Sequence, residues 1–233
     1  MSDPSPINPI PPVVVALFLG LVGIELVLTL GQMGYIGGPQ AVGWRISLQE
    51  QYGFSPTVWA RITEGRWTDI SLVRRLVTFP IVQGGFTEVA FAGALLLALG
   101  KFLSETFHVA AFLLVLLVST VFGAVGFGIY GVAVGVNTPL TGAFSVVFGL
   151  IGAYTYTIWK NAKETGGNQL IAFRIVIVLM CLQLVWVGLG ELIEGFRGRP
   201  TWVANLSAFA AGFAISTLAA PGGWTGFLRR IRG

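Results

Sequence analysis

The chain has 233 residues, of which 55% are hydrophobic and only 10% are charged, and its formal net charge is +4. A soluble domain carries about a quarter of charged residues, so this composition excludes a soluble globular protein. Each membrane-spanning helix needs roughly 20 mainly apolar residues, and the length therefore predicts an all-α integral membrane protein with about six spans. The arginines lie scattered between apolar runs and form no basic patch, so nucleic acid is not an expected partner.

The residues that bind metals and form disulfides are scarce in this chain. Cys181 is its single cysteine and His108 its single histidine. An internal disulfide needs two cysteines, and a metal site needs a cluster of ligands at suitable spacing. We therefore expect no metal, no cofactor and no disulfide.

The first apolar segment follows a polar, proline-rich tail at residues 1–12 and covers residues 13–30. The tail has no Lys or Arg and no small-residue cleavage site, so we expect the segment to remain as a span. It carries Glu25, which at roughly 1.5 Å per residue lies about 18 Å into a hydrocarbon core of about 30 Å. An acid at that depth either faces partners inside the bundle or serves an ion pathway. We favour a protonated or hydrogen-bonded Glu25 at a helix contact over an ion pathway.

A long connection at residues 31–77, called loop 1 below, separates the first two spans. It contains three tryptophans and five arginines: Trp44, Trp59, Trp67, Arg45, Arg61, Arg66, Arg74 and Arg75. The pairs Ser55-Pro56 and Thr68-Asp69 provide N-cap residues and predict two short helices. Arginine and tryptophan on short helices are typical of segments in the membrane interface. We expect loop 1 to rest on, or dip into, one leaflet.

Further apolar runs predict spans two to six at residues 79–99, 109–132, 139–159, 170–192 and 202–218. Together with the first span they form a transmembrane domain at residues 13–220, followed by a basic tail at residues 221–233. Arg174 lies one turn from the start of span five, where its side chain can snorkel to lipid phosphates. We favour this over a buried ion pair with Glu25.

Span four is expected to be the central helix because small residues recur in it at spacings of three, four and seven. These residues are Gly142, Ala143, Gly149, Gly152 and Ala153. On a helix they form a stripe almost free of side chains, and such a stripe lets neighbouring backbones approach closely in lipid.

The run GAFSVVFGLIGAY resembles the fourth transmembrane helix of the rhomboid family of intramembrane serine proteases. In that family a Gly-x-Ser-Gly motif opens the helix and precedes a Gly-x-x-Gly-Ala spacing. The matching positions are Gly142, Gly149, Gly152 and Ala153. The resemblance implies a six-helix rhomboid-like bundle with interfacial helices in loop 1.

Two other stretches carry the same resemblance. Around the start of span two, the family's Arg, Thr and Gly-Gly positions are matched by Arg75, Thr78, Gly84 and Gly85. In the family, the sixth helix has small residues at four-residue spacing and packs against the helix of the nucleophile. Here that stripe is Ala208, Gly212 and Ser216. The resemblance covers residues 75–218.

The catalytic positions of the family are substituted. Its nucleophile falls on Phe144 and the following glycine on Ser145, while its general-base histidine falls on Asn205. An amide cannot accept a proton from serine at neutral pH. The oxyanion-hole histidine and asparagine fall on Glu88 and Ala92, and a carboxylate would repel an oxyanion. Ser145 lies about 100° around the helix from Phe144, so we expect it to face a different neighbour.

These substitutions predict a rhomboid-like pseudoprotease without catalytic residues. The resemblance implies a fold that perturbs the bilayer locally and admits a client helix beside span five. The expected partners are therefore membrane lipids and another integral membrane protein, whose assembly or stability the protein affects. Two alternatives stay open: an active intramembrane serine protease that uses Ser145, and a small transporter or proton-conducting protein that uses Glu25, Glu88 and Arg174.

The orientation is predicted from basic residues in the short loops. With the N-terminus inside, the inner side collects Lys101, Lys160, Lys163 and the arginines of the tail. The arginines of loop 1 break this rule, and interfacial helices account for them. We expect both termini to be cytoplasmic, and the resemblance implies the same topology in a bacterial inner membrane.

Overall fold

Four helices in the described part of the chain are long and apolar enough to cross a membrane. The computed structural model describes residues 10–182, 185 and 200–220, and the four helices are α1 (Pro12–Gln32), α6 (Phe86–Ser104), α7 (Val109–Val134) and α10 (Thr201–Ala219). A further long helix is α8 (Phe144–Thr165), and an apolar helical segment covers Gln169–Leu182, beginning with η4 (Gln169–Phe173). The described residues contain no strand apart from a single bridge between Phe54 and Leu140. The protein is an all-α, multi-pass membrane protein, and this set of helices is compatible with six spans.

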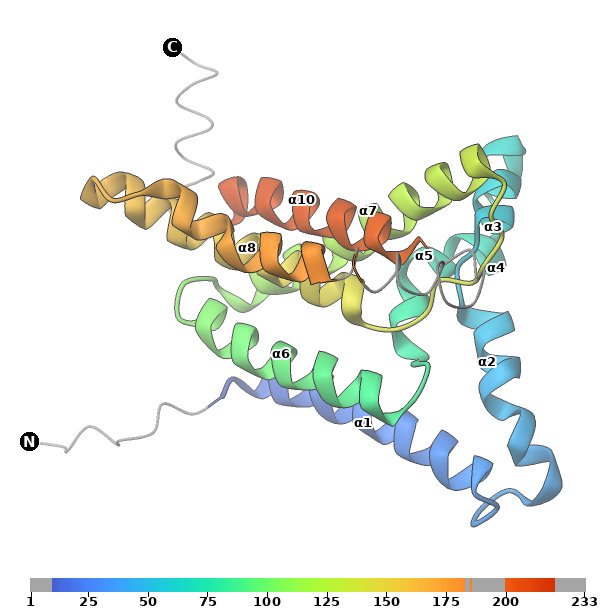
Figure 1. The fold of residues 1–233 in the computed structure, drawn as a ribbon. Helices are drawn as coiled ribbons and strands as arrows, with labels where there is room; N and C mark the ends of the chain where they lie inside the picture. Colours follow the sequence, from blue (N-terminus) through green and yellow to red (C-terminus); the bar gives the residue numbers. More distant parts are fainter. Residues whose placement is uncertain (1–9, 183–184, 186–199, 221–233) are drawn as a thin grey trace, which may run out of the picture.

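Helix α8 lies at the centre of the bundle. It packs against α10, α7 and α6, and α1 packs on the far side of α6, as Figure 1 shows. Most of the first half of α8 is buried, from Ser145 to Tyr156. This agrees with its predicted role as the central helix.

Loop 1 folds into short helices that gather at one end of the bundle, on the right of Figure 1. They are η1 (Gly38–Gly43), α2 (Trp44–Tyr52), α3 (Pro56–Arg61), η2 (Ile62–Arg66), α4 (Ile70–Val73) and α5 (Arg75–Thr78), followed by η3 (Phe79–Ile81). The two predicted helix starts are confirmed, because Ser55 accepts a hydrogen bond from Val58 N–H and Asp69 accepts one from Ser71 N–H. Helix α2 was not predicted.

Two helix starts differ from the prediction. Span two was expected from residue 79, but α6 begins at Phe86, because Pro80 has no N–H to donate and Gly84-Gly85 continue as loop. Span four was expected from residue 139, but α8 begins at Phe144. Gly142 adopts φ 90°, a left-handed conformation that does not belong to a right-handed helix, so the helix begins only after it. Gly142 therefore lies outside the helix whose stripe it was predicted to join.

Several other helix ends also differ from their predicted positions. Span three continues two residues further than predicted, to Val134, where Gly135 adopts the left-handed C-cap conformation. Helix α8 continues beyond the predicted end of span four at residue 159, reaches Thr165 and ends at Gly166, which is also left-handed. Span six begins one residue early, directly after Pro200. The predicted end of span five, like both terminal tails apart from Ile10, Pro11 and Pro12, lies outside the described residues.

Among the residues that the structure describes, three clusters of buried apolar side chains hold the bundle together. One joins α1, α6, α7 and α8 around Phe112 and Leu150. Another lies beneath loop 1 around Phe54 and Phe127. The third joins α6, α8 and α10 to Val176 of the segment after η4. Loop 1 is thus anchored on the bundle by its own core.

Candidate functional site

Helices α8 and α10 cross where neither helix carries a bulky side chain. A Cβ atom at Gly212 would overlap the backbone of Gly149, and one at Gly152 would overlap the carbonyl of Phe209. Ala208 is fully buried beside them, and its carbonyl faces Gly149. Backbones approach this closely in lipid only through small residues. Four of the predicted packing residues thus lie at one crossing.

A polar pair lies at the end of this crossing where α8 begins. The Ser145 hydroxyl donates a hydrogen bond of 3.0 Å to Oδ1 of Asn205. Both residues are almost fully buried, with 2% and 1% of their surface exposed. Helix α7 covers the pair at Gly123, where a Cβ atom would lie 3.2 Å from the Ala204 carbonyl and 3.5 Å from Cβ of Ser145. Three helices therefore enclose this hydroxyl.

The chemistry available to Ser145 follows from this geometry. A serine becomes a nucleophile when a neighbouring base accepts its proton as it attacks. The amide oxygen of Asn205 accepts a hydrogen bond but cannot take the proton at neutral pH. The hydrogen bond therefore satisfies a buried hydroxyl without activating it.

The segment before α6 holds the start of α8. Gln83 is buried; its Nε2 donates to the Pro80 carbonyl (2.7 Å) and its Oε1 accepts from Ala143 N–H (3.2 Å). Ala143 is the N-cap residue of α8, whose first N–H groups have no partner inside the helix. Gln83 thus acts as a cap supplied from 60 residues away.

Glu88 and Ala92 occupy the first turns of α6. Oε2 of Glu88 accepts a hydrogen bond of 2.7 Å from Gly84 N–H, which caps the start of that helix. A Cβ atom at Gly142 would overlap the Glu88 carboxylate, so this carboxylate also lies next to the start of α8. A negative charge there interacts favourably with the helix dipole. Ala92 is fully buried in the cluster that contains Phe148.

Glu25 is buried in an ion pair that joins α1 to loop 1. Nη1 and Nη2 of Arg45 donate to its carboxylate at 2.9 and 2.7 Å, and the Thr29 hydroxyl donates to the same group at 3.0 Å. Nη1 of Arg45 also donates to the Gln83 carbonyl at 2.8 Å. The hydrogen bonds with Glu25 raise the pKa of the Arg45 guanidinium above its ordinary value. Glu25 therefore faces a partner inside the bundle, as predicted, although Arg45 was not identified as that partner.

These contacts form a continuous polar chain. It runs from Glu25 through Arg45 to the backbone and side chain of Gln83, and from there to Ala143 at the start of α8. The same helix then presents Ser145 to Asn205.

Comparison with known protein families identifies the family of this chain. The family described as "Rhomboid domain" matches residues 71–222, about two thirds of the chain. The chain belongs to the rhomboid family. Comparison with curated proteins and with solved structures gives no match.

Within the rhomboid fold, the structure changes one expectation about the positions that align with the family's catalytic residues. Ser145 was expected to face a different neighbour from the family's nucleophile, yet it is Ser145 that bonds Asn205. The reason is helical spacing: Ser145, Gly149 and Gly152 follow at i, i+4 and i+7 and share the face toward α7 and α10. Phe144 lies one position off this face and is half-buried against the cluster of Phe148. That spacing is present in the sequence and was a usable signal.

The remaining ionisable candidates of this rhomboid lie apart from the pair. His108 caps the start of α7, where its Nδ1 accepts from Ala110 N–H at 3.3 Å. It precedes Gly123 by 15 positions, and at about 1.5 Å per residue it lies more than about 20 Å from Ser145. Arg174 is exposed just after η4. Neither side chain is positioned to act on the serine.

Proposed function

We propose that this protein is a catalytically inactive member of the rhomboid family that binds a transmembrane helix of another membrane protein. The observation that supports inactivity is the hydrogen bond from Ser145 to Asn205, in which an amide occupies the place of a base. A serine without a base does not attack a peptide bond at a useful rate. What the chain retains is the rhomboid bundle.

The proposal that the protein binds another helix rests on the apolar surface of the segment after η4. Large apolar side chains are exposed along this segment: Ile175, Ile177, Val178, Leu182 and Val185. In a bilayer such a surface contacts lipid or another helix with similar ease, because apolar burial gives no advantage there. The opposite side of the segment packs on the bundle through Val176. A client helix can therefore approach it laterally.

The inactivity is tested with a fluorophosphonate probe, which labels activated serines. We expect no labelling of the wild-type protein in nanodiscs and the same background in Ser145→Ala. The variant Asn205→His supplies an imidazole at the position that contacts the hydroxyl and serves as the converse test. Labelling of the wild type that disappears in Ser145→Ala would refute the proposal and favour an active protease with a non-standard site.

Client binding is tested by a photocrosslinking amino acid placed at single exposed positions in living cells. Ile177 and Leu182 lie on the proposed surface, and Leu19 of α1 is an equally apolar control, with 60% of its surface exposed. We expect the first two positions to yield adducts whose peptides map to a transmembrane segment of another protein. Equal adducts from Leu19, or only lipid adducts from Ile177 and Leu182, would contradict the proposal.

The position of the Ser145–Asn205 contact also supports the second candidate function, an active intramembrane serine protease. It lies at the α8–α10 crossing, where the rhomboid fold holds nucleophile and base. A transporter has weaker support, because Glu25 is held by Arg45 and Thr29. Loss of proton or solute flux in liposomes on Glu25→Gln would favour the transporter instead.

A further inference from the structure

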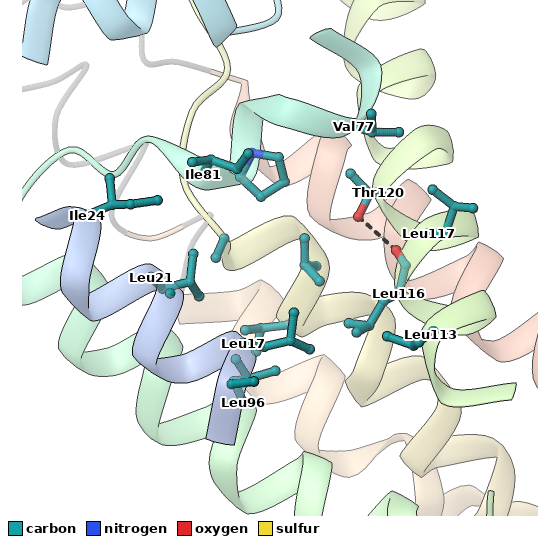
Figure 2. A pocket seen from close by; sticks show the side chains of 16 residues that line it. Leu17, Leu21, Ile24, Val77, Ile81, Leu96, Leu113, Leu116, Leu117 and Thr120 are labelled. Atoms are coloured by element: carbon teal, nitrogen blue, oxygen red, sulfur yellow. Dashed lines mark hydrogen bonds between the residues drawn. The ribbon is translucent and has the colours of Figure 1, made fainter. Parts of the chain in front are cut away.

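An apolar groove of about 440 Å³ opens between α1, α7 and α8, below the segment that contains η3 (Figure 2). Leu17 and Gly20 of α1 line one wall, and Leu113 and Leu117 of α7 line the other. Among the described residues of the lining, Thr120 carries the one polar side chain, and its hydroxyl donates a hydrogen bond of 2.7 Å to the Leu116 carbonyl. Within these described lining residues, the groove therefore offers an occupant no free side-chain donor.

The position of the groove indicates what can enter it. Helices α1 and α7 are membrane spans, and Leu113 and Leu117 remain partly exposed along the opening. The opening therefore faces acyl chains. Its volume lies within the range of about 300 to 1,000 Å³ typical of small-molecule sites. A helix with its side chains is about 10 Å wide, so this volume would accommodate only about one turn of a helix, whereas an acyl chain is much thinner and can enter it.

A cation lies next to the groove on loop 1. Ile70, Arg74 and Val77 follow at i, i+4 and i+7 in helical conformation, so Arg74 shares a face with Val77, which lines the groove. Ile70 on this face is 79% exposed. The Arg74 guanidinium stacks on the Tyr52 ring at 5.1 Å. Its Nε is buried and has no hydrogen-bond partner within the described ranges.

We propose that this groove binds one acyl chain of an anionic glycerophospholipid, whose phosphate is held by Arg74. The apolar walls select the chain, and the guanidinium supplies charge-assisted hydrogen bonds to the phosphate oxygens. The exposed Ile70 and Trp67 lie near Arg74 in sequence and provide apolar surface beside the headgroup. This site is separate from Ser145 and does not depend on the proposed function.

Two glycines of α1 provide a matched test. Gly20 lines the groove and Gly23 does not, yet a Cβ atom at either position meets no atom within 4 Å. Neither Gly20→Leu nor Gly23→Leu should disturb the bundle, but the first side chain fills the groove. The readout is crosslinking by a phosphatidylglycerol that carries a diazirine in its acyl chain, in nanodiscs of phosphatidylcholine. We expect adducts at residues 17–24 and 113–120 in the wild type and in Gly23→Leu, and their loss in Gly20→Leu.

The headgroup is tested separately. With Arg74→Gln we expect the preference for the phosphatidylglycerol probe over the matching phosphatidylcholine probe to fall about fivefold. Arg66→Gln removes an exposed arginine of the same loop and should leave the preference nearly unchanged. Equal adducts in Gly20→Leu and Gly23→Leu, or no adducts at residues 17–24 and 113–120 in the wild type, would overturn the site. Equal adducts from both probes in the wild type would overturn the role of Arg74.

Discussion

The α8–α10 crossing and the junction of loop 1 with α6 hold helices together in different ways. At the crossing, Gly149, Gly152 and Gly212 bring backbone against backbone with no side chain between them. At the junction, Glu25, Arg45 and Gln83 join three parts of the chain through charge and hydrogen bonds. One contact depends on the absence of side chains and the other on their polar groups. A membrane bundle can thus combine both means within one domain.

Each means suits its surroundings. In lipid, apolar burial does not favour helix association, so the crossing gains from the dispersion contacts that close approach allows. The junction lies where loop 1 meets the bundle. Removing one partner of its ion pair leaves the other charge buried without compensation, which is strongly destabilising. The two regions should therefore fail differently when substituted, and the following predictions test that difference.

The largest effect is expected at the crossing. Gly212→Leu places a side chain where the backbone of Gly149 already lies, so α10 must shift away from α8. Overpacking at a site that cannot relax should lower the free energy of unfolding by more than about 3 kcal/mol. The measurement is an unfolding titration in mixed micelles. Gly23→Leu, where a Cβ atom meets open space, is the control; equal unfolding midpoints for the two variants would show that the crossing tolerates side chains.

At the junction, Arg45→Met should destabilise by about 3 kcal/mol. It leaves the Glu25 carboxylate, only 1% exposed, without its cation, and the Gln83 carbonyl without a donor. The double variant with Glu25→Gln removes both charges and should recover much of the loss. A double-mutant cycle over these variants measures the coupling. Additive effects would mean that the pair contributes little.

The two regions also differ in how far the sequence predicted them. The small-residue stripes of α8 and α10 were predicted because their signal is local: the residues recur at helical spacing within one segment. Glu25 was predicted to face a partner inside the bundle, but its ion pair with an arginine was not predicted, since that partner lies 20 residues away in a loop with five arginines. Which arginine turns inward depends on how loop 1 folds over the bundle.

The start of α8 shows the same limit. Small-residue spacing extended the predicted helix back to residue 139, but Gly142 is left-handed and Gln83 caps Ala143 from another segment. Sequence spacing cannot reveal a cap that is supplied by tertiary contact. The helix face on which Ser145 lies could be predicted from its spacing to Gly149. The family motif instead aligns the nucleophile with Phe144, and the prediction followed that alignment.

An intermediate effect is expected for the cap. Gln83→Met keeps the length of the side chain but removes both hydrogen bonds, leaving Ala143 N–H and the Pro80 carbonyl without them. An unsatisfied buried group costs about 1 to 3 kcal/mol, so we expect about 2 kcal/mol of destabilisation. Hydrogen exchange at the first turn of α8 should rise as well. Gln51→Met, at an exposed position of α2, is the matched control; the same exchange rate in both variants would count against the cap.

The smallest effect is expected where the two means of association meet. Ser145→Ala removes one hydrogen bond from a crossing otherwise built of small residues and leaves Oδ1 of Asn205 without this donor. That should cost about 1 kcal/mol in the free energy of unfolding. Asn205→Leu should cost a similar amount, because it leaves the hydroxyl unpaired.

The double variant Ser145→Ala with Asn205→Leu makes the pair apolar at nearly constant shape and should restore most of the stability. Its recovery separates a hydrogen bond that only satisfies two buried groups from one that the fold requires. If the double variant is instead less stable than either single variant, the fold requires this hydrogen bond, as it requires the ion pair at the junction of loop 1. Gly149 and Gly152 alone would then be insufficient to hold α10.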